Sequence, residues 1–492
     1  MKNEPLFDLI KSLSQTEKTY FRKWAKSFSS KPSNYLELFD AIESQKRYDE
    51  TKLKETVGNR YFAQYKKHLN TKLLESLRLY HSANSIEAEI NAYIQNFEIL
   101  KGKGLIYAAQ KALSKAKKSA IKHQRLADQI KIGKYEGTLI KETDNLDQLN
   151  QHFLAYQSSA AEIHTEILKQ IDLEQLHVAM VKWNKSLEWV RTDEELIELD
   201  AIVQGSSQFN QIQETRVAEI QRQYVIGLRH YFLGDFIKSY SSFNKQFQLF
   251  LADSSLRLDQ FNFIRCIANN ALLSIFTTNH QFATHFNRLK SAQISDPSAV
   301  HYQSILIVLL QLMQHCKDKQ YKLACSWMEI NSDEIGQFNK RVVGQNIMYN
   351  EFTLMSFYMV NAYLGNGQPK LALKAINNYL NNAQKTLKQD SFVLARIINL
   401  LVHVELNNLD LLDYELDATY KYLKSKKRIH PFEEASIKFV RNVINRSSSK
   451  EFGVYLDQYH NDLSKVRTMK YEQVVFEFFD FLGWIDRVRE KA

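Results

Sequence analysis

Residues that could do chemistry occur in this chain of 492 residues, but their spacing fits no catalytic or metal site. His280 and His285 are five residues apart and His315 adjoins Cys316, so neither pair has the i,i+4 spacing with which a helix presents two ligands to zinc. The Gly-Lys-Gly turn at 102–104 lacks the further glycine and the preceding strand of a phosphate-binding loop. We therefore expect no catalytic residue, no metal site and no cofactor, hence not an enzyme.

Basic residues do recur at helical spacing in one segment. Lys111, Lys115, Lys118, Lys122 and Arg125 follow one another at steps of 4, 3, 4 and 3, which predicts five cations along one face of one helix. The favoured interpretation is a solvated outer face, because most charge runs on helices are of this kind. The alternative is a surface that contacts phosphates or an acidic protein, although no recognised nucleic-acid-binding signature accompanies these residues.

The net charge of +10 is concentrated near the N-terminus. Residues 1–140 contain 26 Lys and Arg against 15 Asp and Glu, whereas the rest of the chain is close to neutral. Such asymmetry suggests an anionic partner for one end of the chain. With 44% hydrophobic residues, the chain can also bury a continuous core.

The elements that carry these residues read as helices separated at a regular interval. Nine breaks, spaced 39 to 48 residues apart, fall near Gly104, Asn145, Thr192, Gly234, His280, Lys319, Gly367, Leu409 and Lys450. Between them little would stop a helix, because the chain has only 14 Gly and 5 Pro. No alternating hydrophobic pattern predicts a strand. We expect an all-α protein built as a stacked helical-repeat array.

Two domains are expected along the chain. Residues 1–85 predict a compact basic domain of five helices, and residues 86–492 predict the repeat array with a C-terminal capping helix. Several helix starts carry capping chemistry, for example Thr192 with Glu195 and Asp296 before Pro297.

Three cysteines, no apolar N-terminal signal and no apolar run of about 18 residues favour a cytoplasmic protein without a membrane partner.

At two turns the chain resembles the tetratricopeptide-repeat family. The residues that match the two-helix signature of that family are Gly227, Gly234, Phe236, Ser239 and Phe243 at one turn and Tyr363, Gly367 and Ala372 at another. Weaker matches occur after Gly104 and around Ala324. The early tryptophan and the closing proline of that family are missing, and the period exceeds its 34 residues, so longer helices are expected. The resemblance implies an α-solenoid of stacked antiparallel helix pairs.

The resemblance also implies which side chains face a concave groove. In one repeat these would be Tyr224, Leu228 and Tyr231, and in another Phe357, Asn361 and Leu364. Asn361 stands where the family often uses asparagine to hold a peptide backbone, but the basic residues of its carboxylate-clamp members are absent from these positions.

Two functions remain open from the sequence. The leading hypothesis is a non-enzymatic interaction scaffold or adaptor that binds a peptide or helix in the groove. The alternative is a nucleic-acid-associated or regulatory protein that contacts phosphates through its basic N-terminal 140 residues.

Overall fold

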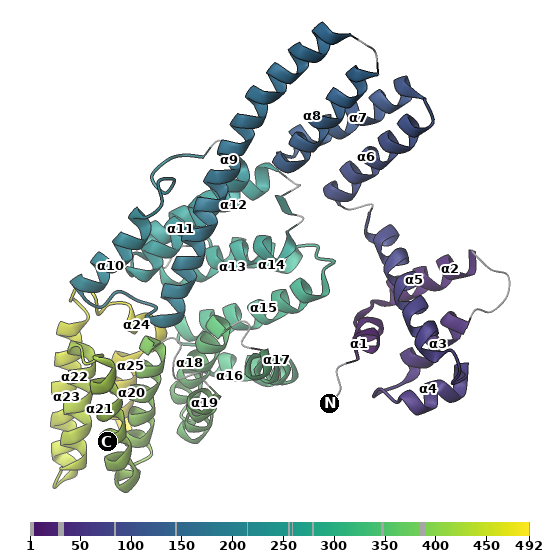
Figure 1. Cartoon of the computed structure of the whole chain (residues 1–492). Helices are drawn as coiled ribbons and strands as arrows, with labels where there is room; N and C mark the ends of the chain where they lie inside the picture. Colours follow the sequence, from purple (N-terminus) through teal and green to yellow (C-terminus); the bar gives the residue numbers. More distant parts are fainter. Residues whose placement is uncertain are drawn as a thin grey trace. The chain divides into compact units, whose positions relative to one another are not determined.

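The computed structural model describes residues 4–27, 34–82, 85–142, 145–213, 215–253, 256–257, 259–277, 280–345, 349–382 and 389–491. These residues form 25 helices and no strand (Figure 1), so the prediction of an all-α protein is confirmed. The chain divides into two compact units, residues 1–163 and 164–492, and the boundary falls inside the 41-residue helix α9.

The first unit has two separate hydrophobic clusters. One is buried among α1 to α5 and the other among α6 to α8. Its helices are α1 (Pro5–Ser12), α2 (Gln15–Ser27), α3 (Asn34–Ser44), α4 (Glu50–Val57), α5 (Phe62–Ser82), α6 (Ile86–Gly102), α7 (Ile106–Lys122), α8 (Leu126–Lys141) and the beginning of α9 (Leu146–Ser186). The boundary expected between residues 85 and 86 stays a prediction.

The second unit contains the remaining helices and the largest hydrophobic cluster. They are α10 (Asp193–Gln204), α11 (Arg216–Phe232), α12 (Phe236–Ala252), α13 (Gln260–Phe276), α14 (Phe282–Ser291), α15 (Pro297–Lys317), α16 (Tyr321–Ile330), α17 (Ser332–Gln345), α18 (Tyr349–Gly365), α19 (Pro369–Asn382), α20 (Gln389–Glu405), α21 (Leu409–Lys426), α22 (Pro431–Ile444), α23 (Ser449–Val466), α24 (Val475–Phe478) and α25 (Phe481–Lys491). From α11 to α23, consecutive helices pack on each other, and α15 also contacts both α13 and α18.

Helix ends lie where local chemistry predicts them. Each of the nine breaks lies between two helices or within two residues of a helix start. The Thr192 side chain accepts a hydrogen bond from the Glu195 backbone N–H, and that of Asp296 accepts from Ala299. Gly234 and Gly367 both have a φ of +71°, a conformation that favours glycine. Capping and turn residues therefore set these boundaries.

The crossing of α11 and α12 shows why small residues recur in the repeats. Ser239 is fully buried, and its hydroxyl donates a 2.8 Å hydrogen bond to the Gly227 carbonyl. A Cβ at Gly227 would lie 2.8 Å from the ring of Phe243, so a larger residue would push the two helices apart. Ala372, on α19, is likewise fully buried.

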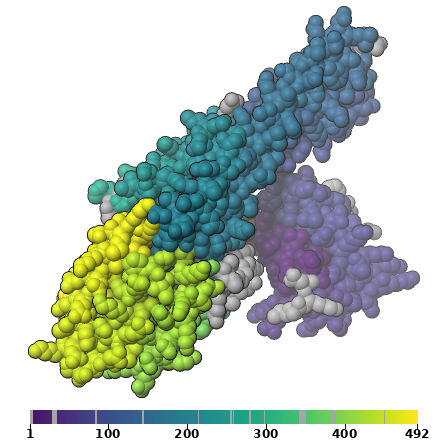
Figure 2. Space-filling view, turned by 60° about the vertical axis from the view of Figure 1, so that its left-hand side comes forward, coloured from purple at the N-terminus to yellow at the C-terminus, as the bar shows by residue number. Residues whose placement is uncertain are grey.

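Buried ion pairs connect distant parts of the second unit. The Arg191 guanidinium lies 3.1 Å from the Glu433 carboxylate and 2.7 Å from that of Glu472, and all three side chains are buried. A second pair joins Arg428 to Asp390 at 3.3 Å. In Figure 2 the yellow C-terminal residues lie directly against the blue and teal part of the second unit. The C-terminal segment is thus an integral part of this unit.

Candidate functional site

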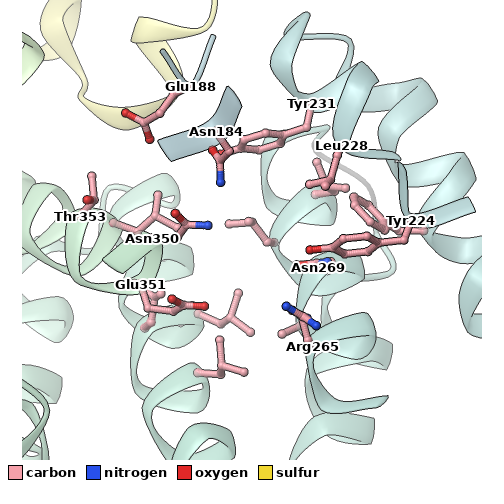
Figure 3. Close-up of a pocket in the computed structure, with 18 of the residues that line it drawn as sticks. Asn184, Glu188, Tyr224, Leu228, Tyr231, Arg265, Asn269, Asn350, Glu351 and Thr353 are labelled. Carbon is pink, nitrogen blue, oxygen red and sulfur yellow. The ribbon is translucent and has the colours of Figure 1, made fainter. Parts of the chain in front are cut away.

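A cavity of about 510 Å³ lies in the second unit among α9, α11, α13, α15 and α18 (Figure 3). Its wall is mainly aliphatic and aromatic. The polar and charged side chains that also line it are Asn184, Lys185, Glu188, Arg265, Asn269, Asn350, Glu351, Thr353 and three tyrosines. A concave, mainly apolar site of this size with a few polar groups is typical of ligand-binding pockets.

One predicted set of groove residues lines this cavity. Tyr224, Leu228 and Tyr231 are spaced by four and three residues, so α11 presents all three on the same face. They stand together on one wall in Figure 3. The structure therefore brings these three residues together, and their binding of a partner stays a prediction.

The other predicted set, Phe357, Asn361 and Leu364, requires a correction. All three side chains are buried within the second unit, so they do not face an open groove. The Asn361 side-chain amide donates to the Phe478 carbonyl at 3.0 Å and accepts from the Asp480 N–H at 3.2 Å. Asn361 does hold a peptide backbone, but it is the chain's own C-terminal segment.

The sequence reasoning missed the free amides of the cavity, of which Asn184 and Asn269 are two and Asn350 on α18 is a third. Asn184 on α9 and Asn269 on α13 make no hydrogen bond with any residue that the structure describes. Neighbouring Asn270 is different, because its amide donates to the carbonyls of Phe243 and Cys266 inside the core. An unpaired carboxamide offers both a donor and an acceptor, which is the pattern needed to pair with a peptide group.

Arg265 is one of two cationic side chains that line the cavity, the other being Lys185. Its guanidinium lies 5.4 Å from the centre of the Tyr224 ring and 5.6 Å from that of Phe261, at cation–π distance. Arg265 and Asn269 are four residues apart, so the helix places them one turn from each other. This four-residue spacing is the sequence signal that could have placed the two side chains on one face of the helix.

The opposite wall carries a carboxylate that a tyrosine already binds. The Tyr302 hydroxyl donates a 2.7 Å hydrogen bond to Glu351 Oε1. The Tyr302 ring stacks on Phe261 with the ring centres 4.4 Å apart. Through this stack, Tyr302 connects Glu351 to Phe261 of α13, the helix that also bears Arg265.

Burial keeps the neighbouring titratable groups neutral. Burial raises the pKa of the Tyr224 phenol, and it raises the pKa of the Cys266 thiol behind the wall. Burial, with the nearby charge of Arg265, lowers the pKa of His177, whose ring lies 4.9 Å from that of Tyr224. None of these three groups is tuned to ionise as a nucleophile or base near neutral pH.

The basic stripe lies in the first unit. Lys111, Lys115, Lys118 and Lys122 are exposed on α7, and none pairs with a carboxylate among the described residues. The expectation that Arg125 continues this face of the helix is wrong, because α7 ends at Lys122 and Arg125 is the N-cap residue of α8.

Arg125 also differs from the four lysines in its contacts. It forms ion pairs with Glu87 at 2.9 Å and Asp128 at 3.2 Å, so it is not a free cation.

Comparison with protein-family models, curated proteins and solved structures finds no match for this chain. Within the described residues, no group of three or more His, Cys, Asp or Glu side chains could hold a metal ion. Nor does any helix in that part of the chain have the length and apolar character needed to cross a bilayer.

Proposed function

We propose that this protein is a non-enzymatic interaction scaffold or adaptor of the cytoplasm that binds a peptide or helix in the cavity among α11, α13 and α15. The second unit would act as a tetratricopeptide-like solenoid of antiparallel helix pairs. The observation that carries the proposal is the pairing of aromatic side chains with the unpaired amides of Asn184 and Asn269 on one concave wall.

The cavity wall offers the two kinds of contact that peptide recognition uses. Tyr224 and Tyr231 each pack against another aromatic ring. The ring centres of Tyr224 and Phe243 are 5.7 Å apart, and those of Tyr231 and Phe236 are also 5.7 Å apart. Large aromatic residues in pockets supply most of the affinity at protein interfaces. The free amides would hold the backbone of the bound segment and set its orientation.

The packing order of the helices supports the solenoid. In a repeat array each helix pair contacts mainly its neighbours, and the first helices of successive pairs line the concave side. The cavity is lined by α11, α13, α15 and α18, each of which is followed by a helix packed against it. The crossing residues Gly227 and Ser239 match the signature positions of that architecture.

Selection from a peptide library displayed on phage tests the proposal. Peptides selected on the full chain should bind it with a Kd that rises at least about tenfold in Asn269→Ala, because the buried amide partner is lost. The matched control is Asn377→Ala on an exposed site of α19. Equal affinity of wild type and Asn269→Ala, measured by fluorescence polarisation, or failure to select any peptide would contradict the proposal.

The stripe of four lysines gives the first unit a second candidate function, binding of nucleic-acid phosphates. The observation that favours it is that these exposed lysines lack carboxylate partners among the described residues. Lys111 also lies over an exposed ring, because its Nζ is 4.5 Å from the ring centre of Tyr107, which is 71% exposed. Exposed aromatic rings between cations are typical of surfaces that bind single strands.

A labelled single-stranded DNA of 30 nucleotides tests this second function. Four neutralised phosphates should make log Kd rise with log salt with a slope of about 3. Replacing Lys115, Lys118 and Lys122 by Glu should abolish binding, whereas the same change at Lys322, Lys370 and Lys374, exposed lysines of α16 and α19, should not. Absence of binding near physiological salt would leave peptide binding as the sole proposed function.

A further inference from the structure

We infer that the cavity selects peptide segments that carry a carboxylate, and that Arg265 is the residue that binds this carboxylate. The inference rests on the proposed peptide-binding function and adds the chemical class of the ligand.

Arg265 has no carboxylate partner among the described residues. The groups that it contacts are the Tyr224 and Phe261 rings and the side-chain oxygen of Asn262, which accepts a hydrogen bond from Nη2. No carboxylate of the described residues forms an ion pair with Arg265. A guanidinium has five N–H donors, so most of its donors are free to bind a ligand. A partly buried cation without an anionic partner favours an anionic ligand.

The carboxylate of Glu351 lines the same cavity but does not serve as the partner of Arg265. Glu351 accepts the hydrogen bond of Tyr302, and no ion pair joins Glu351 to Arg265 among the described residues. Figure 3 shows Arg265 and Glu351 projecting from opposite sides of the cavity. Because Glu351 is bound by Tyr302 and does not pair with Arg265, the guanidinium donors of Arg265 remain available to a ligand.

The anion that Arg265 binds could be a carboxylate or a phosphate. A single guanidinium fork matches the two oxygens of one carboxylate, whereas phosphopeptide sites use clusters of arginine. Glu188 and Glu351 line the same cavity and would repel a dianion more strongly than a monoanion. A carboxylate is therefore the better fit.

Asn269 supplies the neighbouring contact. It lies one turn after Arg265 on α13, and its amide is unpaired among the described residues. When Arg265 binds the carboxylate, Asn269 can hold the adjacent peptide group, which fixes the direction of the segment. The carboxylate can be an Asp or Glu side chain or the C-terminus of the partner.

The test uses two libraries of random ten-residue peptides, one with a free C-terminal acid and one with a C-terminal amide. If the cavity binds a side-chain carboxylate, the peptides selected from both libraries should contain Asp or Glu. If it binds a C-terminal carboxylate, peptides should be selected only from the free-acid library. Replacing the carboxylate of a selected peptide by the amide should weaken wild-type binding at least about tenfold and should hardly change the affinity of Arg265→Gln.

Control variants separate recognition from folding. Arg288→Gln on α14 removes another arginine that lies over a ring, at 5.1 Å from Phe247, but outside the cavity, and should leave affinity unchanged. If Arg265→Gln lowers Tm, Arg265→Lys replaces it, because lysine keeps the charge without the planar fork. This variant should bind the selected peptides more weakly than wild type and should still bind the carboxylate form better than the amide form.

Each outcome has one meaning. Selected peptides without a carboxylate, equal loss of affinity on amidation in wild type and Arg265→Gln, or tighter binding of a phosphoserine peptide than of its Asp counterpart would overturn the inference while peptide binding itself stands. Failure of both libraries to yield any binder would overturn the inference together with the proposed function.

Discussion

At the scale of single residues, the protonation of the buried Asp390 couples stability to pH. Burial raises its pKa to about 7, although the nearby Arg428 and Arg191 lower it. A carboxyl group whose pKa is higher in the folded state binds its proton more tightly there. Its contribution to stability is therefore complete below its unfolded pKa and is lost as the pH rises towards 7.

Replacing Asp390 by Asn should remove this dependence. At pH 4 the folded protein carries a neutral Asp390, so the two proteins should differ little. At pH 8 the wild-type protein carries a buried negative charge at this position. The free energy of unfolding of Asp390→Asn should therefore exceed that of wild type by about 1 kcal/mol or more, since one pKa unit corresponds to about 1.4 kcal/mol. Thermal unfolding of both proteins from pH 4 to 8 measures the difference. A difference that is constant with pH, or that shrinks as the pH rises, would show that Asp390 is not held neutral by its surroundings.

Sequence patterns identified some site residues and missed others for a physical reason. Tyr224, Leu228 and Tyr231 share a helix, so their spacing alone places them on one face. Asn361 could not be judged in the same way, because its partners Phe478 and Asp480 lie 117 and 119 residues further along the chain. Whether an amide such as that of Asn269 is free likewise depends on residues far away in the sequence, because these could have formed hydrogen bonds with it.

At the scale of elements, helix boundaries followed from local chemistry, because a cap or a turn involves residues within a few positions of each other. The buried and exposed faces of α7 could also be predicted, because alanines and lysines alternate at helical spacing along it. The turn before Arg125 was not predicted, because Gln124 adopts a φ of +50° although it is not glycine.

Helix crossings give a prediction at this scale. Ala372 on α19 is fully buried, whereas its neighbour Leu371 is 43% exposed. Ala372→Phe should force extra volume between packed helices and cost about 1–3 kcal/mol, whereas Leu371→Phe should change stability little. The melting temperatures of the two variants, compared with wild type, test this. An unchanged melting temperature in Ala372→Phe would mean that the residue does not lie at a tight crossing.

At the scale of the whole molecule, the sequence predicted helices but not which of their faces meet. Each predicted groove set followed from one repeat considered alone, yet the C-terminal segment packs against α18 and also contributes Phe478 to the cavity that Tyr224 lines. The Tyr358 hydroxyl donates to the Glu477 carbonyl at 2.7 Å as part of the same contact. Contacts between residues so far apart depend on the assembled fold, so a single sequence could not reveal them.

The central claim is that the cavity bearing Leu228 is the place where a peptide binds, and filling the cavity tests it most directly. Leu228→Trp adds an indole ring to a wall of the 510 Å³ space, and Leu323→Trp adds the same ring at a residue of α16 that is 53% exposed. Titration calorimetry with a peptide selected on the wild-type chain should show a Kd at least about tenfold higher for Leu228→Trp, because the added ring occupies the volume that the peptide needs. It should show the wild-type Kd for Leu323→Trp, with both variants melting near the wild-type temperature. A folded Leu228→Trp variant that binds the peptide as tightly as wild type would contradict the claim.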